Sequence, residues 1–176
     1  MPQQSRQDRL DTLRAYQILD TFPEARFERL TRLAVQIFDV PTALISLLDG
    51  DRQWFKSRIG LEACETALDV SFCFHAIQAD DVLVVLDAAK DSRFQSNPLV
   101  TGETGIRFYA GAPLTAPNGV KIGTLCVIDP MPRRSFSAKE RAILKDLASL
   151  VVDELELRRE RLRHEDLTAP TGIPQA

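Results

Sequence analysis

Several features are scarce in this sequence of 176 residues, and each scarcity excludes a class of protein. No apolar run approaches the roughly 18 residues that a membrane-spanning helix needs. The polar N-terminus lacks the apolar segment of a secretory signal. Only two histidines are present, without a Cys-x-x-Cys or His-x-x-x-His motif, which argues against a transition-metal site. The net charge of −3 argues against nucleic-acid binding, which usually depends on clustered basic residues.

Cysteine usage and hydrophobic content place the chain among globular proteins of a reducing compartment. Three cysteines form an odd number without metal-like spacing, and free thiols of this kind are typical of intracellular proteins. A hydrophobic fraction of 44% is sufficient for a sizeable core. We therefore predict one soluble, cytoplasmic domain with no membrane and no nucleic acid as partner.

The hydrophobic period changes along the chain from helical to strand-like and back. Apolar residues at helical spacing predict helices near residues 10–19 and 27–38, and a long helix after a capping box formed by Ser137 and Glu140. Strands are predicted at residues 43–48, 53–59, 82–86, 108–115 and 121–128. Asn118-Gly119, between the last two strands, is typical of a hairpin turn with glycine at positive φ. Hairpins imply antiparallel pairing, so we predict an α+β fold with the helices gathered on one face.

Six segments resemble the GAF domain of bacterial signal-transduction proteins. Residues 106–114 read Ile-Arg-Phe-Tyr-Ala-Gly-Ala-Pro-Leu, residues 123–129 read Gly-Thr-Leu-Cys-Val-Ile-Asp, and Phe136-Ser-x-x-Glu140-Arg follows. The other segments are residues 49–55, 71–77 and 91–99. The resemblance implies a GAF/PAS-like, roughly six-stranded antiparallel sheet, with the N- and C-terminal helices on one face and a ligand pocket with loops on the other. On this basis we expect a flexible N-terminus at residues 1–9, the GAF domain at 10–158, and a charged helix end with a disordered tail at 159–176.

Polar donors next to aromatic residues in the stretch from Arg93 to Arg107, a long loop over the predicted sheet, indicate a lid over a small ligand that is anionic or carries an amide. The residues that we expect to bind the ligand are aromatic or polar and come from this loop or its neighbours: Phe72, Cys73, His75, Arg93, Arg107 and Tyr109. In the alternative interpretation the loop hydrogen-bonds to itself, Arg107 pairs with Asp87 or Asp91, and His75 is a packing residue. The identity of the ligand, and of any cofactor, stays unknown. The cyclic-nucleotide signature and the phytochrome Asp-Ile-Pro signature are both absent.

A catalytic role would rest on the cysteines. One GAF branch, the free methionine-R-sulfoxide reductases, is thiol-based, and Cys64 and Cys73 lie near two of its cysteine positions. The catalytic cysteine of that branch precedes the strand that begins here near Phe108, and residues 101–107 contain no cysteine. We therefore expect no catalytic residues and no enzymatic activity, and keep the reductase as the lesser alternative.

The long C-terminal helix carries more apolar residues than one buried face requires. Leu144, Leu147, Val151 and Leu155 form one stripe, and Ile143, Leu150 and Leu157 form a second beside it. We expect the second stripe to be a homodimer interface, with the N-terminal helix as the competing cover within the same chain.

The resulting hypothesis is a sensory or regulatory GAF domain that binds a small molecule and relays a signal through helix packing in a homodimer. No second domain follows the long helix in the sequence, so a separate kinase or cyclase is the expected output partner, although the sequence is compatible with a segment of a longer chain. The alternative from another class is a structural dimerisation or docking module whose pocket is filled by its own side chains.

Overall fold

A computed structural model of the chain describes residues 6–168. The helices are α1 (Arg6–Tyr16), α2 (Ala25–Phe38), α3 (Phe72–Ala76), α4 (Pro98–Thr101) and α5 (Ala138–Thr168). The strands are β1 (Thr42–Leu48), β2 (Arg52–Ile59), β3 (Glu65–Ala67), β4 (Leu83–Val85), β5 (Phe108–Thr115) and β6 (Lys121–Asp129). The six strands form one antiparallel sheet in the order β3-β2-β1-β6-β5-β4, which confirms the predicted fold class.

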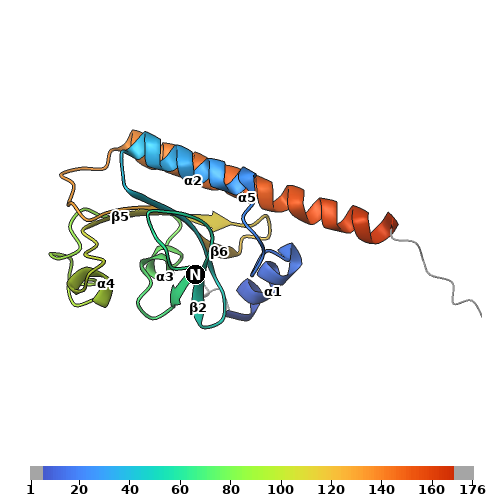
Figure 1. Cartoon of the computed structure of the whole chain (residues 1–176), viewed down its shortest axis with the longest axis horizontal. Helices are drawn as coiled ribbons and strands as arrows, with labels where there is room; N and C mark the ends of the chain where they lie inside the picture. Colours follow the sequence, from blue (N-terminus) through green and yellow to red (C-terminus); the bar gives the residue numbers. More distant parts are fainter. Residues whose placement is uncertain (1–5, 169–176) are drawn as a thin grey trace, which may run out of the picture.

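Two layers cover the sheet. Helices α2 and α5 lie side by side across one face, while α3, α4 and their loops lie on the other (Figure 1). Side chains alternate along the strands, so each strand contributes to the cores on both faces of the sheet. Ile45 and Leu47 lie in the core beneath the helices, and Leu44 and Leu48 lie in the core beneath the loops. The sheet is therefore covered on both sides, and its central strands are buried at nearly every position.

Local signals in the sequence explain where several elements begin and end. The capping box is confirmed, since Glu140 N–H donates to Ser137 Oγ at 3.2 Å and Ser137 N–H donates to the Glu140 carboxylate at 2.7 Å. The hairpin turn is also confirmed, with φ of 82° at Gly119 and a hydrogen bond from Gly119 N–H to Ala116 O of 2.8 Å. Helix α2 ends at Phe38, and its C-cap Asp39 adopts the left-handed conformation with φ of 50° just before the Val40-Pro41 pair.

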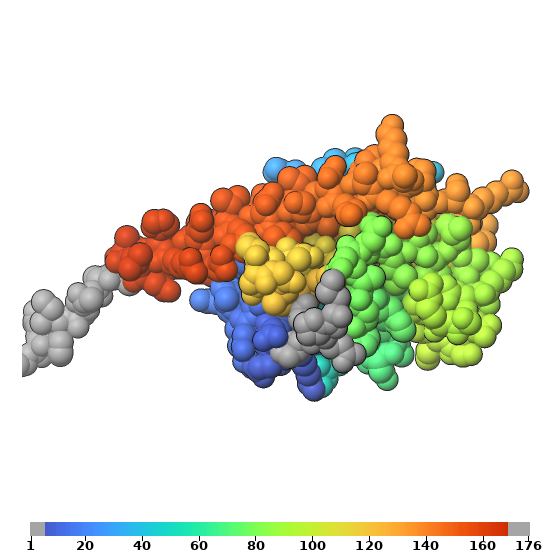
Figure 2. Space-filling model, turned by 180° about the vertical axis from the view of Figure 1, so that it is seen from behind, coloured from blue at the N-terminus to red at the C-terminus, as the bar shows by residue number. Residues whose placement is uncertain are grey.

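The ends of the chain differ in part from the expectation. Residues 6–9, expected to be flexible, form the first turn of α1, in which Arg9 is buried. Helix α5 continues to Thr168 and projects past the body of the domain (Figures 1 and 2). The predicted disordered tail at residues 169–176 lies outside the described residues. Within residues 6–168, no helix combines the length and the apolar character that a bilayer crossing demands.

Candidate functional site

The loop face of the sheet holds an aromatic cluster at the place where the ligand was expected. Phe72 stacks on Phe94 with ring centroids 4.1 Å apart, and the ring of Tyr109 lies 5.2 Å from that of Phe72. All three side chains are buried. Tyr109 folds back over Gly111, where a Cβ atom would overlap the tyrosine hydroxyl. These side chains fill the space between α3 and the sheet.

A pair of thiols lies beneath the aromatic cluster. Cys73 Sγ on α3 is 3.8 Å from Cys126 Sγ on β6, and the Tyr109 hydroxyl donates to Cys73 Sγ at 3.3 Å. The hydrogen bond with Cys73, together with burial, raises the pKa of the Cys126 thiol. Burial also raises the pKa of Tyr109. Cys64, by contrast, is exposed in the connection between β2 and β3.

The three basic residues expected at the site, Arg93, Arg107 and His75, all contact groups of the protein itself. Arg93 forms an ion pair of 2.6 Å with Asp91, and its guanidinium carbon is 5.2 Å from the centre of the Phe94 ring. Arg107 donates to Val100 O at 2.9 Å and to its neighbour's carbonyl, so the pairing with Asp87 or Asp91 considered above is wrong: Arg93 takes that role for Asp91. His75 packs edge-on against Phe94, and burial together with the nearby Arg93 cation lowers the pKa of His75.

A cavity of about 540 Å³, which we call the sheet cavity, lies beneath the α4 loop. Its walls come from the start of β1, from β2, from the β2–β3 connection, from the segment after α4, and from the end of β6. Most of the lining is apolar, from Pro41, Leu44, Phe55, Leu61, Ala63, Leu99, Ile106, Ile128 and Pro130. Among the described residues that line it, Glu103 alone is charged. The Gln53 amide is already engaged, because its Nε2 donates to Thr66 Oγ1 at 3.3 Å and its oxygen accepts from Ser71. The chemistry of this cavity therefore suits an apolar ligand.

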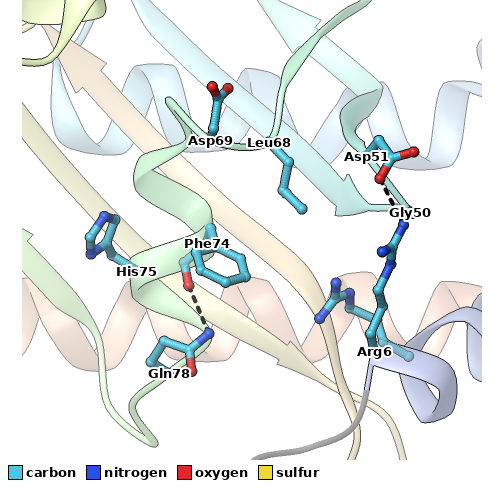
Figure 3. A pocket seen from close by; sticks show the side chains of 9 residues that line it. Arg6, Gly50, Asp51, Leu68, Asp69, Phe74, His75 and Gln78 are labelled. Carbon is cyan, nitrogen blue, oxygen red and sulfur yellow. Dashed lines mark hydrogen bonds and ion pairs between the residues drawn. The ribbon is translucent and has the colours of Figure 1, made fainter.

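A second and larger cavity of about 850 Å³, which we call the N-terminal cavity, opens between α1, the β1–β2 turn and α3 (Figure 3). Its lining is more polar: Arg6, Arg9, Gly50, Asp51, Leu68, Asp69, Phe74, His75 and Gln78. Arg6 crosses the mouth to form an ion pair of 2.7 Å with Asp51, and both side chains are largely exposed. Within residues 6–168, no cluster of histidine, cysteine, aspartate and glutamate is arranged to hold a metal ion.

The architecture described above has a counterpart among known proteins. The family model of the GAF domain matches residues 23–155. The chain belongs to the GAF family. A cyclic di-GMP phosphodiesterase of Pseudomonas aeruginosa is 41% identical to this GAF domain over 156 residues, which is 89% of this chain and 26% of that enzyme. The chain thus spans about a quarter of the length of this relative.

Solved structures share the fold of this GAF domain at low sequence identity. The GAF domain of an Acinetobacter phosphoenolpyruvate-protein phosphotransferase has a TM-score of 0.62 at 19% identity, covering 93% of this chain and 97% of that one. The free methionine-R-sulfoxide reductase of Neisseria meningitidis, solved in complex with its substrate, has a TM-score of 0.63 at 16% identity, covering 89% and 91%. The fold therefore occurs both in GAF domains of larger proteins and in enzymes.

The six residues expected to bind a ligand and the residues that line the two cavities of this GAF domain overlap very little. The structure brings Phe72, Cys73 and Tyr109 together as predicted neighbours, yet it packs them into the core. Of the six expected residues, only His75 lines one of the two cavities described here. The lining of the sheet cavity was missed because its apolar residues look like ordinary core positions in the sequence. The lining of the N-terminal cavity was missed because α1 begins earlier than the hydrophobic period indicates.

Proposed function

We propose that this GAF domain is a sensory module that binds a small, largely apolar molecule in the sheet cavity. The observation that carries the proposal is the cavity itself, which lies between the sheet and the α4 loop and has apolar walls whose Gln53 amide is already satisfied. A ligand there would contact both the strand face and the connection between β2 and β3. The family membership supports a sensory role, since the neighbouring structures include domains of sensor proteins.

The proposal includes relay through α5 in a homodimer. This helix has 31 residues, a length of about 46 Å at 1.5 Å per residue, and it carries Leu150 and Leu157 on its outer surface with exposed fractions of 47% and 51%. Helix α1 packs against α5 but leaves these two leucines uncovered. Ile143, the third expected interface residue, packs partly against the core. An apolar face of this kind on a long helix favours association with a second copy.

We propose further that the domain acts without catalysis, in the cytoplasm, and controls an output domain or partner. The 41% identity to part of a cyclic di-GMP phosphodiesterase makes cyclic di-GMP turnover the first output to test, with a kinase or cyclase as alternatives. The three free cysteines are consistent with a reducing compartment. The absence of cysteine at residues 101–107 argues against a reductase of the kind that the structural neighbours include.

The ligand proposal is tested with a neutral, apolar fluorescent probe, N-phenyl-1-naphthylamine, together with native mass spectrometry of the purified protein. We expect the fluorescence of the probe to rise when it binds to wild-type protein whose sheet cavity is empty. In a preparation that retains a ligand from expression, the rise should be smaller, because the ligand occupies the site. Leu61→Trp fills the cavity and should abolish probe binding, whereas Leu86→Trp, outside the cavity, should not. Equal probe binding in both variants would contradict the proposed site.

The dimer is tested by sedimentation of wild type and of the double variant Leu150→Glu, Leu157→Glu. We expect wild type at about 100 µM to sediment as a dimer and the variant as a folded monomer, because paired chains would bring four carboxylates together. A wild type that is monomeric at this concentration would contradict the relay proposal.

A second candidate function has its own observation. Phe72, Phe94 and Tyr109 fill the space that the resemblance assigns to a ligand, as expected of a docking or dimerisation module without ligand. A wild type that binds no probe, retains no small molecule and still dimerises would favour this candidate.

A further inference from the structure

Arg9 is a buried cation beside the N-terminal cavity. Only 5% of the residue is exposed, and its Nε donates to Leu48 O at 2.9 Å. Within residues 6–168, no carboxylate lies within ion-pair distance of its guanidinium, and no protein acceptor is found for its two terminal nitrogens. Burial, with the neighbouring Arg6 charge, lowers the pKa of Arg9. A buried guanidinium that lines a cavity without a counter-ion is costly to maintain unless something else pairs with it.

The other charged groups around the cavity do not neutralise Arg9. Asp51 is paired with Arg6 at the mouth. Asp69 is exposed, and in Figure 3 its carboxylate points away from Arg6 and Gln78. Asp49, whose charge acts on Arg9 from a distance, forms its ion pair with Arg52 at 3.1 Å. Within residues 6–168, Arg9 is therefore left without a carboxylate in direct contact, although Asp51 and Asp69 also line the cavity.

Apolar surface lies on the opposite wall. Phe74 is 39% exposed although it follows two buried residues of α3, and its ring lies toward the cavity near Leu68 (Figure 3). Gln78 adds an amide whose Nε2 donates to Phe74 O at 3.3 Å and whose oxygen accepts no hydrogen bond from residues 6–168. An exposed aromatic ring facing a buried guanidinium suits a molecule that has both an apolar part and an anionic group.

We propose that the N-terminal cavity binds a small molecule whose carboxylate or phosphate pairs with Arg9 and whose apolar part rests against Phe74. This site is separate from the sheet cavity, shares no lining residue with it, and selects a different chemical class. This proposal does not depend on ligand binding in the sheet cavity. The bound molecule would also connect α1 to α3, since Arg9 belongs to α1 and Phe74 to α3.

Three probes separate the contributions of charge and apolar surface. Benzoate carries both, inorganic phosphate carries only the anion, and benzamide carries the ring without the charge. Titrations are followed by amide and arginine Nε–H shifts in ¹⁵N correlation spectra. We expect benzoate to bind more tightly than phosphate, benzamide not to bind, and the shifts to gather at Arg9, Gly50, Phe74 and Gln78.

Variants assign the site. Arg9→Gln should weaken benzoate binding at least about tenfold, as expected for loss of one charge-assisted contact. Phe74→Ala should weaken benzoate binding and leave phosphate binding unchanged, and it keeps the proposal testable if Arg9→Gln does not fold. The matched control, Arg32→Gln on the exposed surface of α2, should bind all three probes as wild type does.

Three results would overturn the proposal. The first is that benzamide binds as tightly as benzoate, and the second is that a folded Arg9→Gln variant retains the affinity of wild type for benzoate. The third is that benzoate produces no saturable shifts, or only shifts at residues that line the sheet cavity, such as Leu99 and Ile106.

Discussion

Lys56 is the clearest place to test the physical description of this domain. Its side chain is fully buried on β2, and its Nζ donates to Glu24, Thr21 Oγ1 and Phe22 O at 2.8, 2.8 and 2.7 Å. Glu24 also accepts from Arg158 of α5 at 2.9 Å. The change Glu24→Gln keeps the size of the side chain and removes the charge that Lys56 and Arg158 share.

The loss of stability expected for Glu24→Gln follows from the burial of Lys56. Removing one partner of a buried ion pair costs about 3–5 kcal/mol, because the other charge is left without compensation. Glu24 is 24% exposed and Lys56 keeps two oxygen acceptors, so we expect the low end, about 3 kcal/mol. Burial already lowers the pKa of Lys56, and loss of Glu24 should lower it further.

The difference between wild type and variant should depend on pH in a defined way. Burial alone would raise the pKa of Glu24, but the hydrogen bond and charge of Lys56 bring it below its ordinary value of 4.5. A carboxylate with a lowered pKa stabilises the fold fully above its unfolded-state value and loses this contribution as the pH falls through the folded-state value. The destabilisation should therefore be constant near neutral pH and shrink in acid below pH 4.5.

The assay is urea unfolding at pH 7, followed by the fluorescence of Trp54, the single tryptophan. With a urea slope of about 2 kcal/mol per molar, a loss of about 3 kcal/mol lowers the midpoint by about 1.5 M. The control Glu160→Gln, exposed on α5, should leave the midpoint unchanged. Glu24→Gln combined with Lys56→Met should regain much of the loss, because an apolar side chain replaces the stranded charge. A midpoint for Glu24→Gln within about 0.3 M of wild type would refute the reasoning.

Two further predictions concern the thiols and the hairpin. In the native protein, a thiol reagent should modify Cys64 rapidly and should modify Cys73 and Cys126 only on unfolding, because these two thiols are buried. Mass spectrometry of the quenched reaction counts the labels. Rapid modification of all three cysteines in the native protein would contradict the burial of Cys73 and Cys126. Gly119→Val should destabilise the fold by roughly 1 kcal/mol or more in the same urea assay, because φ is 82° there and a β-branched residue resists this region. A Cβ atom at Gly119 would have no neighbour within 4 Å, so a valine there gains no packing contacts that could offset the backbone strain. An unchanged urea midpoint would therefore contradict the prediction.

Much of the fold could be predicted from the sequence because it depends on local signals. The short, largely apolar run at residues 43–48 predicts a buried strand, and the observed strand lies between two cores. The capping box at Ser137 and the Asn118-Gly119 dipeptide act through their own backbone, so they needed no tertiary context.

The position of α1 depends on tertiary contacts, which the hydrophobic period does not report. Residues 6–9 are polar, and the helical pattern begins only with Leu10. Helix α1 nevertheless starts at Arg6, because Arg6 pairs with Asp51 and Arg9 donates to Leu48 O, both on the β1–β2 hairpin. Partners some 40 positions away in sequence cannot be inferred from spacing.

The candidate site was only partly predictable for a related reason. Cys73 and Tyr109 were expected together, and their contact follows from α3 lying over β5. Whether neighbours surround an empty space or fill it depends on rotamers, and here Phe94 inserts its ring against Phe72. Gly111 contributes to this outcome by leaving room for the tyrosine ring, a role that its place in an apolar strand does not reveal.

The two cavities differ in how a ligand could influence α5. The sheet cavity lies on the face of the sheet opposite to α5, so a signal from it has to cross the strands. The N-terminal cavity is lined by α1, whose last residue, Tyr16, donates to Glu156 on α5. Arg158 holds the same junction from α5, donating to Tyr16 O at 3.2 Å and to Gln17 O at 2.9 Å. A ligand that moves α1 would therefore act directly on the part of α5 that carries Leu157, whereas a ligand in the sheet cavity would have to act through the core.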